Sequence, residues 1–108
     1  IYHGSDSNKA EVVHILESGQ HFVTLVDSLK LELVYVDDIL PPLRELSQSL
    51  AGIPSLSANF EAKEIVQTWC IKLNQMRASD RLDESDSRQM SLDLDSAYSL
   101  FHRAVSRI

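Results

Sequence analysis

The chain has 108 residues, of which 44% are hydrophobic and 24% charged, and these values are typical of one folded domain rather than of a disordered chain. Its 16 acidic and 10 basic residues give a net charge of -6. Phosphate backbones and anionic membranes are repelled by such a charge, so we expect neither nucleic acid binding nor direct membrane insertion. The single cysteine, Cys70, cannot form an intrachain disulfide, and no apolar run approaches the roughly 20 residues that span a bilayer, so we predict a cytoplasmic protein.

The chain starts with a polar stretch, IYHGSDSN, which has no periodicity and is interpreted as a flexible lead-in or a remnant of an expression vector. A single domain is therefore predicted over residues 9–108. Its first helix is expected over residues 9–33, where apolar residues cluster on one side: Val12, Ile15, Leu16, Gly19, Phe22, Val23, Val26, Leu29 and Leu33. Gly19 costs about 1 kcal/mol relative to Ala in this position, which a close helix crossing would explain.

A second, mostly polar stripe follows the other side of the same helix. It comprises Gln20, Thr24, Asp27 and Leu31, at intervals of four, three and four, with Lys30 at its edge. His14 and His21 are seven residues apart, about 10 Å along a helix, which is too far for both to bind one metal ion. We expect these two histidines to face solvent.

The segment LELVYVDD is rich in residues that favour strands, but a lone strand finds no partner elsewhere in the chain. It is therefore interpreted as the end of the first helix and a tight connection. Asp37 or Asp38 is predicted to cap the second helix, with Pro41 and Pro42 in its first turn or just beyond. Gly52 and Pro54 are predicted to end it after residue 51.

Asn59 is the predicted cap of a third helix that runs to about residue 76, with Trp69 as a core anchor and Cys70 as a buried structural thiol. The fourth helix is predicted over residues 86–107, capped by Asp83 or Ser85. Its apolar stripe is Met90, Leu94, Ala97, Tyr98, Phe101, Val105 and Ile108. The acidic residues before this helix lack the spacing of a calcium-binding loop and are interpreted as helix caps.

Leu92 lies about half a turn away from the centre of that stripe, among polar residues that include Asp95. It is either an isolated exposed leucine or part of a binding surface. Four helices with short connections predict an all-α, antiparallel up-and-down four-helix bundle. Because the sequence has no glycine-rich phosphate loop, Ser-His-Asp arrangement or HExxH motif, we expect no enzyme activity, cofactor or metal.

Four blocks of the sequence resemble the C-terminal domain of the vacuolar protein sorting-associated protein 28 family, a subunit of the ESCRT-I complex. They are FVTLVDSLKLEL, DDILPPLREL, NFEAKEIVQTW and SDRLDESDSRQMSLDLDSAYSLFHRAV, and they occur in the order and spacing of the family. Two departures are a second proline, Pro42, and Leu92, which stands where the family has an aromatic residue.

The resemblance implies a non-catalytic adaptor that links ESCRT-I to ESCRT-II and/or ESCRT-III during multivesicular body sorting of ubiquitinated cargo. Such a protein would be recruited peripherally to endosomal membranes and would meet the other ESCRT-I subunits through a part that this chain does not contain. The predicted partner-binding residues are Thr24, Asp27, Lys30, Leu31, Leu92 and Asp95. The alternative is a structural bundle that packs within its own complex and contacts no downstream factor.

Overall fold

The computed structural model describes residues 3–107, and within the first helix it describes side chains from Lys9 onward. This part of the chain is all-α, as predicted. It forms α1 (His3–Lys30), α2 (Val36–Ala51), α3 (Glu61–Asn74) and α4 (Glu84–Val105).

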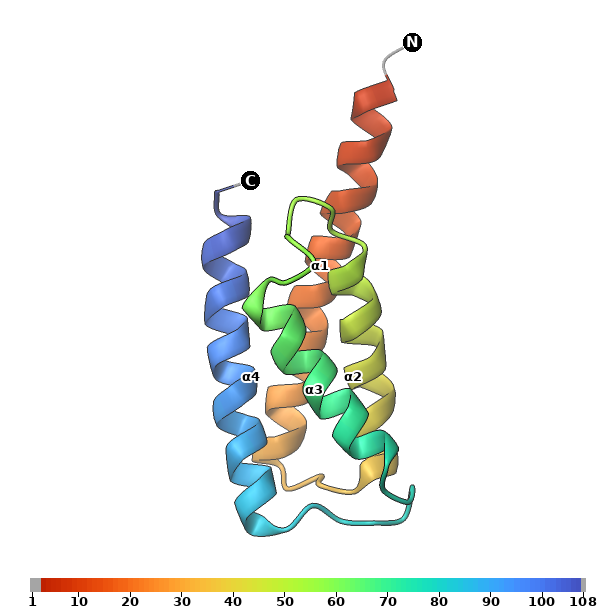
Figure 1. Cartoon of the computed structure of the whole chain (residues 1–108), viewed down its shortest axis with the longest axis vertical. Helices are drawn as coiled ribbons and strands as arrows, with labels where there is room; N and C mark the ends of the chain where they lie inside the picture. Colours follow the sequence, from red (N-terminus) through yellow and green to blue (C-terminus); the bar gives the residue numbers. More distant parts are fainter. Residues whose placement is uncertain (1–2, 108) are drawn as a thin grey trace.

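The four helices form the predicted up-and-down bundle, with principal extents of 52 × 24 × 23 Å (Figure 1). Helix α1 packs against α2 and α4, and α3 packs against the same two helices. The α1–α2 and α3–α4 connections lie side by side at one end of the bundle, whereas the α2–α3 connection lies at the other. The N-terminal part of α1 extends beyond the ends of the other helices.

Helix α1 begins at His3, six residues before the predicted start, so the backbone of residues 3–8 is helical. Residues 1–2 and the side chains of residues 3–8 lie outside the described part of the chain, so the proposed lead-in stays a prediction. The helix ends at Lys30, three residues before the predicted end.

The predicted buried face of α1 is partly wrong. Phe22 and Leu29 are buried as predicted, and so is Leu25, which the prediction left out. The ring of Phe22 lies 5.4 Å from the rings of Tyr98 and Phe101 on α4. Several residues assigned to the core are instead exposed: Val12, Leu16, Val23 and Leu33. The prediction assigned two apolar faces of this helix to the core, because residues of the buried face and of an adjacent exposed face alternate along the sequence.

The close helix contact predicted at Gly19 occurs at Gly52. A Cβ atom at Gly19 would meet nothing within 4 Å, whereas one at Gly52 would lie 2.7 Å from Cδ2 of His14. Gly52, at the C-terminal end of α2, therefore leaves room for the imidazole ring of α1. His14 and His21 are half-buried on the side of α1 that faces α2, and Nδ1 of His21 lies 3.7 Å from Oε2 of Glu45, so the prediction that both histidines face solvent is wrong.

Helix α2 begins at Val36, so Asp37 and Asp38 lie in its first turn and the predicted side-chain cap is wrong. The other connection supplies the cap: the N–H groups of Val36 and Asp37 donate to the carbonyls of Asp80 and Ala78 at 2.9 and 3.0 Å. Backbone oxygens thus satisfy the free donors of the first turn.

Pro41 and Pro42 lie inside α2, in its second turn and so just beyond the first, as predicted. A proline has no N–H to donate, so the carbonyls of Asp37 and Asp38, four residues earlier, lose their helical hydrogen bonds. Both aspartates are exposed, and solvent can satisfy those carbonyls.

Helix α3 begins at Glu61 with Phe60 at the cap position and without a side-chain cap, so the prediction of Asn59 is wrong. Trp69 is buried as predicted, and its Nε1–H donates to Asp93 on α4 at 2.8 Å. The cap of α4 is confirmed as Asp83, whose carboxylate accepts the N–H of Asp86 at 2.7 Å.

Candidate partner-binding surface

Two connections of the bundle are joined at the end where α1 stops and α4 starts. Tyr35 and Arg81 form an antiparallel β-bridge, and Leu82 N–H donates to the carbonyl of Val34 at 3.0 Å. The guanidinium of Arg81 lies 5.9 Å from the centre of the Tyr35 ring, within the range of a cation–π contact. The segment read as lacking a strand partner therefore has one in the α3–α4 connection.

The turn that follows α1 carries a left-handed residue that is not glycine. Glu32 has φ 61°, and it is the one non-glycine residue with positive φ among those described. The N–H of Leu33 donates to the backbone carbonyl of Ser28, and the N–H of Glu32 donates to the backbone carbonyl of Leu29. These two hydrogen bonds are the pair that defines a Schellman motif. Glycine is favoured at this position because a side chain costs roughly 1–2 kcal/mol in the left-handed conformation.

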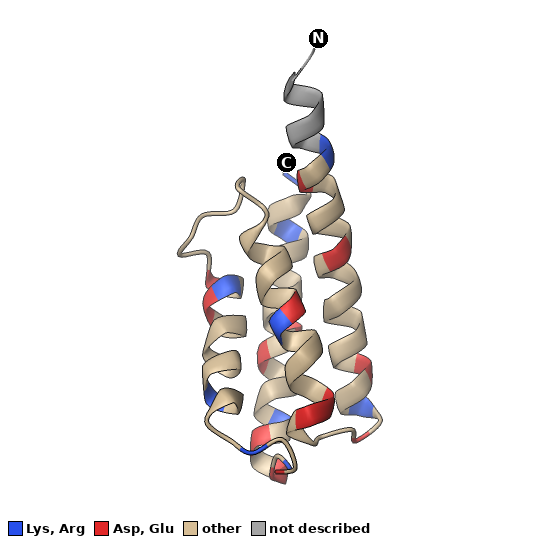
Figure 2. Cartoon of the chain, turned by 90° about the vertical axis from the view of Figure 1, so that its right-hand side faces the viewer, with Lys and Arg blue, Asp and Glu red and all other residues tan. Residues whose placement is uncertain are grey.

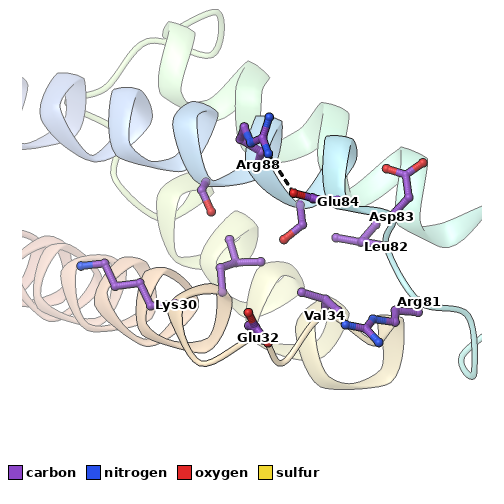
Figure 3. Close-up of a pocket in the computed structure, with 11 residues that line it drawn as sticks. Lys30, Glu32, Val34, Arg81, Leu82, Asp83, Glu84 and Arg88 are labelled. Atoms are coloured by element: carbon purple, nitrogen blue, oxygen red, sulfur yellow. Dashed lines mark hydrogen bonds and ion pairs between the residues drawn. The ribbon is translucent and has the colours of Figure 1, made fainter.

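A groove of about 730 Å³ runs between this turn and the start of α4 (Figure 3). Its floor is formed by the buried side chains of Leu29, Val34 and Leu82. Lys30 from α1 and Arg88 from α4 stand on opposite walls, and Arg88 pairs with Glu84 at 3.0 Å. The groove thus has an apolar floor and a rim of mixed charge.

Exposed apolar side chains surround the end of α1. Leu31 is 72% exposed, Leu33 45% and Tyr35 46%, whereas Val34 and Val36 are buried. The connection therefore places alternate side chains in the core and in solvent. Tyr98, from the predicted stripe of α4, is half-buried against Phe22, whereas Tyr35 is exposed.

All six residues predicted to bind a partner have exposed side chains: Thr24, Asp27, Lys30, Leu31, Leu92 and Asp95. Lys30 lines the groove, the helical spacing places Thr24 and Asp27 on the outer side of α1, and Leu31 directly follows the last residue of α1. Leu92 is 57% exposed on α4, with Asp95 one turn further along. Five of the six therefore lie on α1 and α4, Leu31 lies directly after α1, and Lys30 is the one that lines the groove between these helices.

Sequence reasoning missed several residues of this surface. Glu32, Arg81 and Arg88 line the groove, and Leu33 and Tyr35 are exposed apolar residues of the α1–α2 connection. One signal was available for Glu32: no glycine or asparagine directly follows the first helix, so any left-handed residue at its end is of another type. Arg81 depends on the pairing of two connections, which a pattern within one helix does not reveal.

The described residues contain no group of three or more His, Cys, Asp or Glu side chains that could hold a metal ion. Burial raises the pKa of the Cys70 thiol, with a smaller opposing effect from Arg44, and the thiol donates to the carbonyl of Leu43 at 3.7 Å. A thiol held in its protonated form is a poor nucleophile. None of the helices, over the residues described, is both long and apolar enough to cross a membrane.

Acidic and basic residues are interspersed along the helices instead of forming one basic face (Figure 2). Fold and surface together define the class: a small all-α bundle domain whose exposed apolar side chains lie on α1, on α4 and at the end where these helices meet.

The chain belongs to the VPS28 protein family, whose profile matches residues 2–105. It is 42% identical over 101 residues to vacuolar protein sorting-associated protein 28 of Dictyostelium discoideum, a match covering 94% of this chain and 35% of that protein. It is also 42% identical over 103 residues to homolog 2 of Arabidopsis thaliana, covering 95% of this chain and 48% of that protein. The chain thus spans less than half the length of these two relatives.

A solved structure shares the fold. The X-ray structure of the yeast ESCRT-I Vps28 C-terminus matches with a TM-score of 0.75 and 29% sequence identity, over 83% of this chain and 89% of that one. The family resemblance expected from the four sequence blocks is therefore confirmed.

Proposed function

We propose that this chain is a non-catalytic adaptor domain of an ESCRT-I subunit, which recruits ESCRT-II and/or ESCRT-III components during multivesicular body sorting of ubiquitinated cargo. The observation that carries the proposal is the match, over 83% of this chain, to the yeast ESCRT-I Vps28 C-terminus. That match covers a bundle with its own buried core, which leaves its exposed side chains available to another protein. The domain would act in the cytoplasm, at the surface of endosomes.

The proposed binding residues divide into anchors and orienting charges. Leu31 and Leu92 expose apolar surface, which a partner would remove from water. Asp27, Lys30 and Asp95 would set the orientation and reject partners of the wrong charge, and Thr24 adds a hydroxyl on the same side of α1 as Asp27. No hydrogen bond or ion pair within the described residues occupies these six side chains, so binding does not first have to break one.

Calorimetric titration with purified ESCRT-II and with purified ESCRT-III subunits tests the proposal. We expect the wild-type domain to bind at least one of them. We expect Asp27→Ala, Leu31→Ala or Leu92→Ala to weaken binding by about 1–2 kcal/mol without lowering the melting temperature by more than a few degrees. Ile71→Ala is the matched control, because Ile71 is a similarly exposed apolar residue (54%) on α3. Absence of binding to both complexes would contradict the adaptor function.

The second candidate is a structural bundle that packs permanently against its own subunit or a sister subunit. The exposed apolar residues of α1 favour it, because a permanent interface covers such surface. Sedimentation of the isolated domain distinguishes the two: we expect a soluble monomer for an adaptor, and self-association for a domain that has lost a permanent neighbour.

A further inference from the structure

One side of α1 has a regular seam that the bundle leaves uncovered. Its positions alternate at intervals of three and four: Lys9, Val12, Leu16, Gly19, Val23, Val26 and Lys30. Val12, Leu16 and Val23 are 51%, 68% and 48% exposed, and Val26 is half-buried at the edge of the core. Alternation of three and four is the spacing with which one helix packs along another.

Gly19 at the centre of the seam has no role inside the bundle. A Cβ atom there would meet nothing within 4 Å, and its φ is not positive, so neither space nor backbone conformation requires a glycine. Glycine weakens a helix relative to alanine, and here the fold gains nothing in return. A glycine in the middle of an exposed apolar seam does, however, let the backbone or a large side chain of another helix come close.

The charges along α1 indicate what kind of helix fits. The seam begins at Lys9 and ends at Lys30, both exposed, and neither has an acidic partner among the described residues. No Lys, Arg, Asp or Glu occurs from Ser18 to Val26 (Figure 2). Asp27 lies beside the seam, one turn from its C-terminal end.

These charges disfavour a second copy of the same chain. An antiparallel pair of seams centred on Gly19 would place each Lys9 opposite the Lys30 of the other copy, and a parallel pair would place Lys9 opposite Lys9. Like charges facing each other across such a seam are destabilising.

We propose that the seam is a docking site for an amphipathic helix of another protein, apolar along one face and acidic at both ends of that face. Lys9 and Lys30 are 21 residues apart, about 32 Å along the axis, so the partner helix needs about six turns. The inference rests on the proposed function and deepens it, because it assigns a helical segment as the partner. The docked helix would run to the groove at the end of α1, since Lys30 belongs to both.

The test uses a synthetic peptide of about 24 residues, with leucine at the seam-facing positions and glutamate at both ends. A second peptide, with lysine in place of the terminal glutamates, is its control. Binding to the domain is measured by fluorescence anisotropy up to ~100 µM. We expect the glutamate peptide to bind at least tenfold more tightly than the lysine peptide.

Two variants of the domain place the binding on the seam. Leu16→Glu introduces a charge and Gly19→Leu fills the central gap, and each is expected to weaken binding of the glutamate peptide at least tenfold. Neither touches the core, because Leu16 is exposed and Gly19 faces open space, so circular dichroism should show folded domains. Ile71→Glu on α3 is the matched control and is expected to bind as the wild type does.

The same variants are titrated with ESCRT-II and ESCRT-III subunits. If wild type and seam variants bind a subunit equally, the seam proposal is overturned while the adaptor function stands. If the wild type binds neither complex but binds the glutamate peptide and loses it in the variants, the adaptor function fails and the seam stands. The seam proposal is also overturned if the domain binds neither peptide, if both peptides bind equally, or if a dimer forms that Leu16→Glu dissociates.

Discussion

Replacing Glu32 with glycine should stabilise the protein. Glu32 is the left-handed residue of the turn that ends α1, with φ 61°. Releasing a side chain from this conformation gains roughly 1–2 kcal/mol, and the greater freedom of glycine in the unfolded chain offsets roughly 0.5–1 kcal/mol. The expected net gain in the free energy of unfolding is about 0.5–1 kcal/mol, or about 3–6 °C in melting temperature. Urea unfolding followed by circular dichroism at 222 nm measures it.

Leu31→Gly is the control, because it makes the same kind of change one residue earlier. Leu31 is 72% exposed and its φ is not positive, so glycine there relieves no strain and should cost about 0.5–1 kcal/mol. Opposite signs for the two variants support the left-handed assignment. A Glu32→Gly variant that is less stable than the wild type would refute the reasoning, since its carboxylate makes no hydrogen bond or ion pair with the described residues that could be lost.

Three further predictions concern other positions. Gly19→Ala should raise the melting temperature by about 4–8 °C, because alanine stabilises a helix by about 1 kcal/mol relative to glycine and its Cβ meets nothing here. Gly52→Ala should lower the melting temperature, because its Cβ meets the ring of His14. Differential scanning calorimetry compares the two variants. Asp83→Ala should destabilise the bundle by about 1 kcal/mol in urea unfolding, and Asp83→Asn should be nearly neutral because it keeps the capping oxygen. The raised pKa of Cys70 contributes stability to the folded state that is fully present below the ordinary thiol pKa and is lost as the pH rises from that value toward the raised one. Unfolding measured from pH 7 to 10 should therefore show this loss of stability at the alkaline end, and a Cys70→Ala variant should lack it.

The sequence was sufficient for the elements whose pattern is local. The stripe of α4 from Met90 to Val105 was predicted correctly, and so was Asp83 as one of its two possible caps, because period and capping chemistry both lie within a few residues. Ile108, the last residue of the predicted stripe, lies outside the described residues. Predictions that depend on how elements meet were less successful. Nothing local indicates that the carbonyls of Ala78 and Asp80 would cap α2, or that an apolar residue such as Leu16 belongs to a solvent face.

The proposed surface is also where local rules for a stable turn are broken. A Schellman motif usually places glycine at its left-handed residue and a hydrophobic contact between the next residue and one a turn earlier. Here the left-handed residue is Glu32, and the contact would join Leu33, which is 45% exposed, to the polar Ser28. Breaks of this kind cost stability and persist where the side chains serve another purpose. If Glu32→Gly stabilises the domain but weakens binding to an ESCRT partner, the carboxylate is retained for recognition. If stability rises with unchanged binding, that recognition rests on the leucines and charges of α1 and α4 alone.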